Sequence, residues 1–180
     1  AGRNLLKLIH IRSIGMVNSM PFLLLYDYAS AFPSVAHAWM FSILEAIDLW
    51  QAFLNGIKNL YKGNEAYAVS DGLMQHLFSI LCGVLQGCPL SGTLFVFVMD
   101  PLLWSFKRYL SGTVTRACAD DVGMALRRLE VLSLVYKLFE DFRSVSLFTF
   151  KPAKCVLITT VCATSSWNVD MIRAYLRRQV

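Results

Sequence analysis

Apolar and polar residues follow two different periods along this chain. A short, nearly continuous apolar run at residues 21–26 is typical of a strand buried on both faces, and residues 155–161 contain a second strand candidate. Apolar residues recur every three or four positions, as on one side of a helix, within residues 35–47, 50–61, 93–110 and 129–142. The pattern predicts four helices, with Ser34 as the cap of the first and a bend or restart at Pro101 in the third.

Two hairpins are expected between these elements. Residues 66–70 and 77–81 are strand-like and are separated by a segment that contains Asp71-Gly72, a pattern that predicts a hairpin. Residues 113–118 and 122–126 flank the acids of a second turn. Strands and helices thus interleave, with hairpins among them. The expected fold class is α+β, with an antiparallel sheet backed by helices on one face.

Composition narrows the class of protein further. The chain has 180 residues, of which 56% are hydrophobic and 16% charged, so it can bury a single core and is not intrinsically disordered. The stretch from Leu77 to Met99 carries no charge. Gly83, Gly87 and Pro89 interrupt it, and these residues break a helix. We therefore expect no membrane-spanning segment.

Charge and cysteine usage point to an intracellular protein with a basic half. From residue 101 onward there are 12 Lys and Arg against 6 Asp and Glu, whereas residues 1–100 have 5 against 6. A basic half suits a polyanionic partner, although many basic proteins never bind nucleic acid.

The five cysteines form no C-x-x-C pair, which argues against a zinc site. No secretory leader pattern precedes them. We expect an intracellular location, either nuclear or cytoplasmic.

Three carboxylates stand beside strongly apolar elements. Asp27 ends the first strand, and Asp120 and Asp121 lie at the second hairpin turn. If these strands are neighbours in one sheet, the acids form a cluster of like charges that requires a cation or raised pKa values. Oxygen ligands without His or Cys select Mg²⁺ or Mn²⁺, and two such ions about 3.5–4 Å apart can promote nucleotidyl transfer. The alternative is that Asp120-Asp121 is an ordinary solvated turn.

Four segments resemble a known family. LYDYASAFPSV, GVLQGCPLSGTLF, CADDVGMAL and FKPAKC occur in the order and spacing of polymerase motifs A, B, C and D. The residues of these segments resemble the motifs of reverse transcriptases from non-LTR, LINE-like retroelements. RNA-dependent RNA polymerases are a less suitable match, because Phe32 and Ala119 depart from their usual motifs. The resemblance implies an RNA-directed DNA polymerase that binds an RNA template, a DNA primer and a deoxynucleoside triphosphate.

The resemblance also implies roles for individual residues. Asp27, Asp120 and Asp121 would hold two Mg²⁺ or Mn²⁺ ions. Lys154 would donate a proton to pyrophosphate or contact a phosphate, although a lone lysine is more often a solvated surface residue. Phe32 would exclude a 2′-hydroxyl from the incoming nucleotide; its alternative is a core phenylalanine.

Motif B and the start of the chain would contact the nucleotide and template. Gln86 and Gly87 would form a loop there, Gly87 permitting close backbone approach and Pro89 stiffening the entry to the next helix; the alternative is an ordinary strand-to-helix turn. Arg3 would contact the triphosphate.

The resemblance predicts a single domain fragment made of a polymerase palm and part of the fingers. Residues 21–63 and 92–180 would be palm, 1–20 the end of the fingers, and 64–91 a fingers-side hairpin with the motif B loop. The thumb is expected to be absent, and the remaining fingers, thumb or endonuclease domains would belong to a longer parent protein. Pro33, Leu85 and Cys118 depart from the family pattern. A second hypothesis is therefore a catalytically inactive, truncated relic that keeps the palm fold and at most binds nucleic acid weakly.

Overall fold

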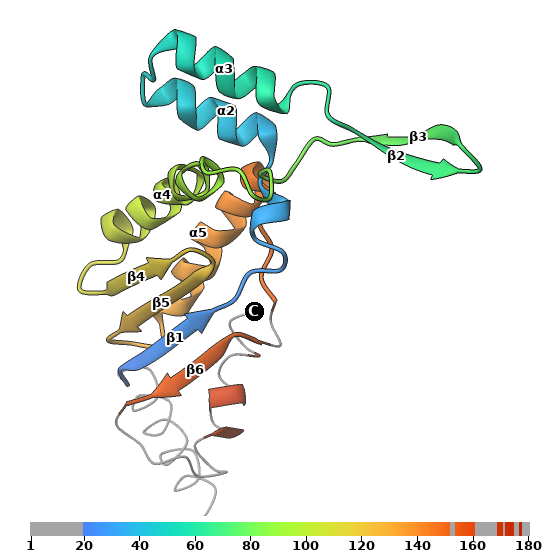
Figure 1. Ribbon diagram of the computed structural model, residues 1–180. Coiled ribbons are helices and arrows are strands. Elements are labelled where there is room, and N and C mark those ends of the chain that lie inside the picture. Colours follow the sequence, from blue (N-terminus) through green and yellow to red (C-terminus); the bar gives the residue numbers. More distant parts are fainter. Residues whose placement is uncertain (1–19, 152–153, 161–168, 171, 175–176, 178–180) are drawn as a thin grey trace, which may run out of the picture. The chain divides into compact units, whose positions relative to one another are not determined.

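The chain is divided into two compact units. The computed structural model describes residues 20–151, 154–160, 169–170, 172–174 and 177 (Figure 1). One unit, here called the sheet unit, comprises the described residues up to Asp27, Leu102–Asp141 and those from Phe150 onward. The other, the helical unit, comprises Tyr28–Pro101 and Phe142–Thr149. Arg3 and Cys162 lie outside the described residues.

A four-stranded antiparallel sheet forms the centre of the sheet unit. Its strands, in the spatial order β4-β5-β1-β6, are β4 (Val114–Cys118), β5 (Asp121–Leu126), β1 (Phe22–Tyr26) and β6 (Val156–Thr159). In the central pair Phe22 lies opposite Leu126, and Tyr26 opposite Val122. The strands β4 and β5 form the predicted second hairpin, so the α+β class and the antiparallel sheet are confirmed.

One face of this sheet is buried and the other is open. Phe22 and Leu24 are 1% and 6% exposed, whereas Leu23 and Leu25 on the opposite face are 39% and 44% exposed. The prediction that residues 21–26 are buried on both faces is therefore wrong. A wholly apolar strand cannot reveal by its own pattern that only one of its faces is covered.

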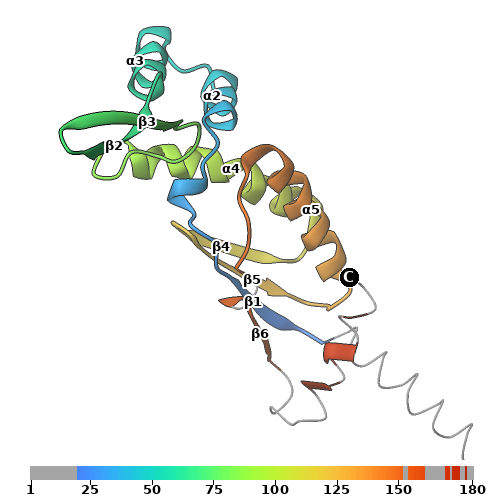
Figure 2. The same cartoon turned by 90° about the vertical axis from the view of Figure 1, so that its right-hand side faces the viewer.

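Two helices cover the buried face. The sheet unit includes the part of helix α4 (Ser91–Tyr109) after Pro101 and the part of helix α5 (Val131–Ser146) up to Asp141. The ring of Phe139 on α5 lies 4.7 Å from that of Tyr26 and 5.0 Å from that of Phe106 on α4. Figure 2 shows both helices on one side of the strands.

Pro101 does not interrupt the long helix α4. Pro101 lies inside α4, and both of its flanking segments are helical. None of the helices in the described ranges combines the length and the apolar character needed to cross a bilayer.

The helical unit contains two short helices and the first hairpin. A 3₁₀ turn, η1 (Phe32–Ser34), precedes α2 (His37–Ala46) and α3 (Gln51–Tyr61), and β2 (Glu65–Ser70) pairs with β3 (Leu73–Ser79). The connecting residues Asp71 and Gly72 have φ values of 52° and 76°. Two successive positive φ angles characterise a type I′ hairpin turn. The predicted hairpin is confirmed, but its second strand begins at Leu73 rather than at residue 77.

Ser34 does not cap the helix that follows it. It ends η1, and its hydroxyl donates a hydrogen bond to the carbonyl oxygen of Ala29 at 3.2 Å. Helix α2 begins at His37 after Ala36, without a side-chain cap. Pro33 explains part of this arrangement, because a proline is well tolerated in the first turn of a helix, where its missing N–H has no partner to lose. The motif departure at Pro33 thus coincides with a 3₁₀ turn.

Candidate active site

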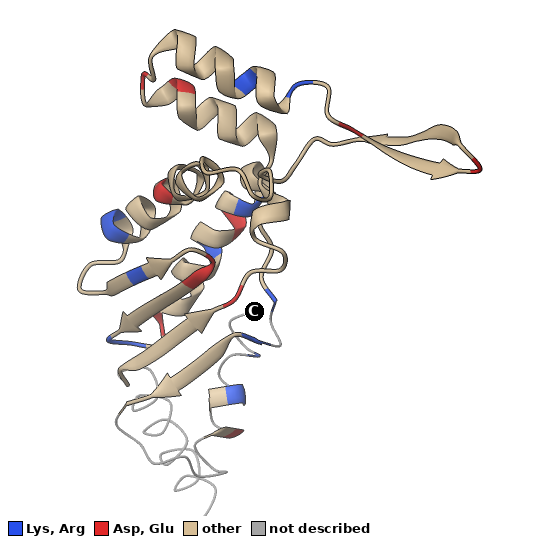
Figure 3. Ribbon diagram, viewed as in Figure 1, with Lys and Arg blue, Asp and Glu red and all other residues tan. Residues whose placement is uncertain are grey.

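The ends of β1 and β5 bring two acidic residues opposite each other. Asp27 follows β1 directly, and Asp121 is the first residue of β5. Because Tyr26 pairs with Val122 in an antiparallel register, the next position places Asp27 opposite Asp121. By strand alternation both positions belong to the open face of the sheet. Figure 3 shows acidic segments at this end of the strands.

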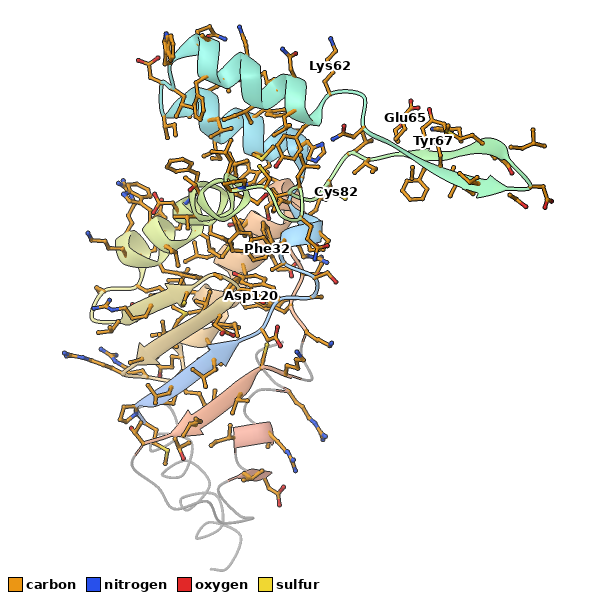
Figure 4. The ribbon with its side chains drawn as sticks, in the orientation of Figure 1. Phe32, Lys62, Glu65, Tyr67, Cys82 and Asp120 are labelled. Atoms are coloured by element: carbon orange, nitrogen blue, oxygen red, sulfur yellow. The ribbon has the colours of Figure 1, made fainter. Side chains whose placement is uncertain are left out.

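A tight turn places the third acid at the tip of the β4–β5 hairpin. Cys118 pairs with Asp121, so Ala119 and Asp120 are the turn residues. Ala119 has a φ of 51°, a left-handed conformation that costs a non-glycine residue on the order of 1–3 kcal/mol. Such a positive φ at the first central residue is typical of two-residue hairpins. Asp120 is labelled at the end of the strands in Figure 4.

Lys154 neutralises part of this acidic end. Its Nζ lies 2.7 Å from Oδ2 of Asp27, with the lysine side chain 57% exposed and the aspartate side chain 23% exposed. The hydrogen bond and the charge of Asp27 raise the pKa of Lys154 above its ordinary value, and Asp120 and Asp121 raise it further. The structure thus gathers Asp27, Asp120, Asp121 and Lys154 in one electrostatic cluster.

Backbone hydrogen bonds fix the lysine segment beside β1. The N–H of Lys151 donates to the carbonyl oxygen of Asp27 at 2.9 Å, and the N–H of Lys154 donates to the carbonyl oxygen of Lys151 at 2.8 Å. Lys151 makes both contacts through its main chain, so they do not depend on its side chain.

The donor set of this cluster suits a hard divalent cation. Three carboxylates without His or Cys select Mg²⁺ or Mn²⁺ over zinc. Within the part of the chain that the structure describes, no group of three or more His, Cys, Asp or Glu side chains is close enough to hold a metal ion. The ammonium group of Lys154 instead forms an ion pair with Asp27. The three carboxylates suit a hard divalent cation by their chemistry, and a metal ion at Asp27 would replace this ion pair.

Three other predicted residues lie around one hollow in the helical unit. Phe32, Gln86 and Gly87 line a hollow of about 930 Å³, together with His37 and Tyr61. Figure 4 labels Phe32 and Cys82, which also lines the hollow, beside the start of α2.

The aromatic ring of Phe32 is held by a second ring. It stacks on Phe95 of α4, with centroids 4.4 Å apart and an interplanar angle of 16°. Phe32 itself is partly exposed, whereas Phe95 is buried. Phe32 is therefore only partly a core residue. One side of its ring packs on Phe95, and the residue also lines the hollow.

Backbone contacts join the segment of Phe32 to the motif B segment. The N–H of Val84 donates to the carbonyl oxygen of Phe32 at 3.1 Å, and the N–H of Gly83 donates to that of Val35 at 2.8 Å. A Cβ on Gly83 would lie 3.1 Å from the carbonyl oxygen of Pro33, and Gly83 has a φ of 93°. Gly83 thus lies in close contact with the backbone of Pro33, a contact that sequence reasoning missed. The close approach of Gly87 to a nucleotide stays a prediction.

Gly87 and Pro89 have simpler local roles. Gly87 has a φ of 83°, but a Cβ there would meet nothing within 4 Å, so its glycine is required by backbone conformation. Pro89 is exposed and precedes the first turn of α4, and it does not line the hollow.

Two side chains that the sequence did not single out hold the motif B segment. Nε2 of His37 lies 2.8 Å from the carbonyl oxygen of Gly83. The hydroxyl of Tyr61 accepts a hydrogen bond from the N–H of Leu85 at 3.3 Å. The two rings meet edge to face at 4.9 Å. No local pattern identifies these residues, because each acts on a segment more than twenty positions away.

Comparison with known proteins identifies the family. The model of the family "Reverse transcriptase (RNA-dependent DNA polymerase)" matches residues 4–172. The chain therefore belongs to the reverse transcriptase family. The matched residues include all four motif segments and both groups of predicted site residues except Arg3.

Relatives of known description come from mobile elements. The chain is 28% identical over 155 residues to the retrovirus-related Pol polyprotein of the type-2 retrotransposable element R2DM of Drosophila melanogaster. It is 28% identical over 137 residues to the transposon TX1 uncharacterized 149 kDa protein of Xenopus laevis. These matches cover 83% and 71% of this chain but only 14% and 10% of the relatives. They confirm the resemblance to non-LTR retroelements.

Solved structures share the fold at much lower identity. Telomerase of Candida tropicalis truncated from its C-terminal domain superposes with a TM-score of 0.59 at 14% identity, over 88% of this chain and 36% of that chain. Telomerase of the same organism in complex with a TWJ fragment of telomeric RNA gives a TM-score of 0.66 at 11% identity, over 88% and 29%. At this identity the likeness establishes the fold alone.

Proposed function

We propose that this chain is the nucleotide-transfer core of an RNA-directed DNA polymerase, made of the palm and part of the fingers. It joins a deoxynucleoside triphosphate to a DNA primer 3′-hydroxyl opposite an RNA template. The observation that carries the proposal is the register of β1 and β5, which sets Asp27 opposite Asp121 beside the Asp120 turn. Carboxylates close together at one end of a sheet repel each other unless cations neutralise them. Polymerases use divalent cations held in this way.

In this proposal Asp27, Asp120 and Asp121 hold two Mg²⁺ or Mn²⁺ ions. When bound, such ions acidify the primer hydroxyl and stabilise the leaving pyrophosphate. Asp121 belongs to the β4–β5 ladder, and Asp27 and Asp120 directly adjoin residues of paired strands rather than lying on a long loop, so the sheet limits their movement. Rigid placement is what electrostatic stabilisation of a phosphoryl transition state requires.

Lys154 is the proposed proton donor of the reaction. Its ammonium group forms an ion pair with Asp27. With cations held by the carboxylates, the exposed lysine side chain would be available to the triphosphate. There it would donate a proton to the pyrophosphate oxygen as the bond to the α-phosphorus breaks.

The hollow of the helical unit is where the nucleotide and template contacts are proposed. Phe32 excludes the 2′-hydroxyl of a ribonucleotide, because its ring is braced by Phe95 and cannot retreat without losing that stacking. Gln86 and Gly87 line the same hollow and would meet the base pair. The RNA template, DNA primer and remaining domains of a longer parent complete the machinery.

Primer extension tests this proposal. A 5′-labelled DNA primer on an RNA template is incubated with deoxynucleotides and Mg²⁺, using a chimera in which residues 20–160 replace the aligned segment of the R2DM polyprotein. We expect extension by the chimera, abolition by Asp120→Asn, and no change with Asp48→Asn, an exposed turn acid whose positive φ suits asparagine. Extension that persists in Asp120→Asn would overturn the assignment. A folded chimera that never extends would favour the inactive-relic hypothesis.

A further inference from the structure

A second charged hollow lies at the end of the sheet unit opposite the acids. It has a volume of about 370 Å³ and is formed by the α4–β4 and β5–α5 connections, with Ser111, Gly112, Thr113, Arg127, Arg128 and Glu130 among its lining residues. Arg127 directly follows β5, whose other end carries Asp121. Six residue steps at about 3.4 Å each separate these two along the strand, roughly 20 Å. The hollow is therefore distinct from the acidic cluster.

The two arginines of this hollow have unused hydrogen-bonding capacity. Neither Arg127 nor Arg128 forms an ion pair with an acid in the described ranges, although Glu130 lines the same hollow. A Cβ on Gly112 would lie 3.7 Å from Nε of Arg127, an ordinary contact distance, so this guanidinium group lies close to the α4–β4 connection. Two guanidinium groups and hydroxyl-bearing residues thus line one concave surface.

The charge and the donors of the hollow suit a phosphodiester. Two guanidinium groups and one carboxylate leave a single positive charge, which matches the single negative charge of a phosphodiester. Arginine also matches phosphate oxygens through its forked donors. The lining therefore complements the backbone of a nucleic acid, and competition with inorganic phosphate distinguishes this ligand from free phosphate.

The neighbouring end of α4 adds aromatic surface. Trp104 and Tyr109 are each 55% exposed, and the guanidinium carbon of Arg108 lies 5.0 Å and 5.8 Å from their ring centroids. Exposed aromatic rings beside cations are typical of surfaces that bind single strands, whose bases are free to stack. Figure 3 shows basic segments on α4 near its C-terminal end and in the connection after β5.

We propose that this hollow is a second nucleic-acid site, in which Arg127 and Arg128 bind phosphodiester groups of a single strand about 20 Å from the acidic cluster. The site does not depend on the acids or on divalent ions. Its function is to hold a strand, rather than to react with it. It therefore goes beyond the proposed polymerase activity, and either proposal can fail without the other.

Salt-dependent binding tests this inference without any catalysis. The full chain is titrated into a fluorescein-labelled 20-nucleotide single-stranded RNA in EDTA, and anisotropy is read between about 50 and 300 mM salt. Each lost phosphate contact to a single strand lowers the slope of log K against log salt by about 0.7, which is about fivefold in affinity at 0.1 M salt. For Arg127→Gln/Arg128→Gln we expect a slope smaller by about 1.4 and binding about 25-fold weaker.

Matched variants separate a site from a general charge effect. Lys62→Gln/Lys137→Gln removes the same charge from exposed positions elsewhere, and we expect its slope and affinity to stay near wild type. Arg127→Lys/Arg128→Lys should keep the slope and lose part of the affinity, because lysine keeps the charge but not the forked donors. Circular dichroism confirms that each variant is folded.

Three results would overturn the inference. One is wild-type affinity and slope in Arg127→Gln/Arg128→Gln. Another is an equal loss in the control double variant. The third is displacement of the RNA by millimolar inorganic phosphate in wild type but not in the Gln double variant, which would make the hollow a free-phosphate site.

Discussion

The Nζ atom of Lys154 lies 2.7 Å from Oδ2 of Asp27, although 126 positions separate the two residues in the chain. The pair joins the lysine of the FKPAKC segment to the aspartate of the LYDYASAFPSV segment. Because the proposed metal ions would need the same carboxylate, the lysine would compete with them for Asp27. This relationship leads to a measurable consequence for metal affinity.

Removing the lysine charge should tighten metal binding. In Lys154→Gln, Asp27 no longer has an ammonium partner, so Mn²⁺ followed by electron paramagnetic resonance should bind about two- to fivefold more tightly, as expected for an exposed ion pair. Lys151→Gln is the matched control, because Lys151 contacts Asp27 only through its backbone N–H. Equal tightening in both variants would contradict a specific role for Lys154.

The pH dependence of this effect follows from the direction of the pKa shift. Asp27 raises the pKa of Lys154 above 10.5, so the ion pair is fully present below that pH and is lost only as pH rises through the raised pKa. The affinity ratio between Lys154→Gln and wild type should therefore be constant between about pH 6.5 and 8.5. A ratio that falls toward one across this range would mean that Lys154 deprotonates near neutrality.

Phe32 should govern the choice of sugar. Phe32→Val shortens the side chain, so ribonucleotide use relative to deoxynucleotide use in primer extension should rise by roughly 10- to 200-fold, the range that steric discrimination by a few carbon atoms provides. Phe97→Val is a control on α4, where the partly exposed ring does not line the hollow. An unchanged ratio in Phe32→Val would remove the role given to the ring.

The two positive-φ glycines of motif B should differ in their tolerance of alanine. Gly83→Ala brings a Cβ to within 3.1 Å of a backbone oxygen in addition to the strained φ, whereas Gly87→Ala meets no atom within 4 Å. We expect Gly87→Ala to cost about 1–2 kcal/mol of unfolding free energy and Gly83→Ala to cost distinctly more. Urea denaturation followed by circular dichroism measures both. The reverse order would contradict the backbone contact between Gly83 and Pro33.

Adjacent leucines of β1 should report which face of the sheet is covered. Leu24 is 6% exposed and Leu25 is 44% exposed. Leu24→Ala should therefore lower the unfolding free energy by about 2–5 kcal/mol, and Leu25→Ala by clearly less, because it removes little buried area. Equal losses in urea denaturation would indicate that the second face is also covered.

Local patterns were sufficient for most of the secondary structure. The helical periodicity and the Asp71-Gly72 turn depend on residues close in sequence, so the helices and both hairpins could be predicted. The burial of only one face of β1 could not be predicted, because consecutive apolar residues such as Leu23, Leu24 and Leu25 show no alternation that would distinguish the two faces. Ser34 failed as a cap because it ends the 3₁₀ turn that contains Pro33, and α2 begins only at His37.

The site residues that belong to sequence motifs could be predicted, whereas those that act through tertiary contacts could not. The motif resemblance singled out Asp27, Asp120 and Lys154, but their mutual contacts depend on strand register, which no local pattern specifies. His37 and Tyr61 hold the motif B segment through long-range hydrogen bonds. A histidine on an apolar helix carries no sequence signal that distinguishes such a contact from ordinary burial.

Binding of Mn²⁺ to the chain and its Asp variants tests most directly whether the three acids form one metal site. Asp27→Asn and Asp120→Asn should each weaken Mn²⁺ binding by at least about tenfold, because each removes a charged ligand from a small set of hard oxygen donors. Asp48→Asn should bind as wild type does. If both ligand variants retain wild-type affinity, the acids at the end of β1 and the β4–β5 turn do not hold the metal, and the proposed polymerase chemistry has no site here.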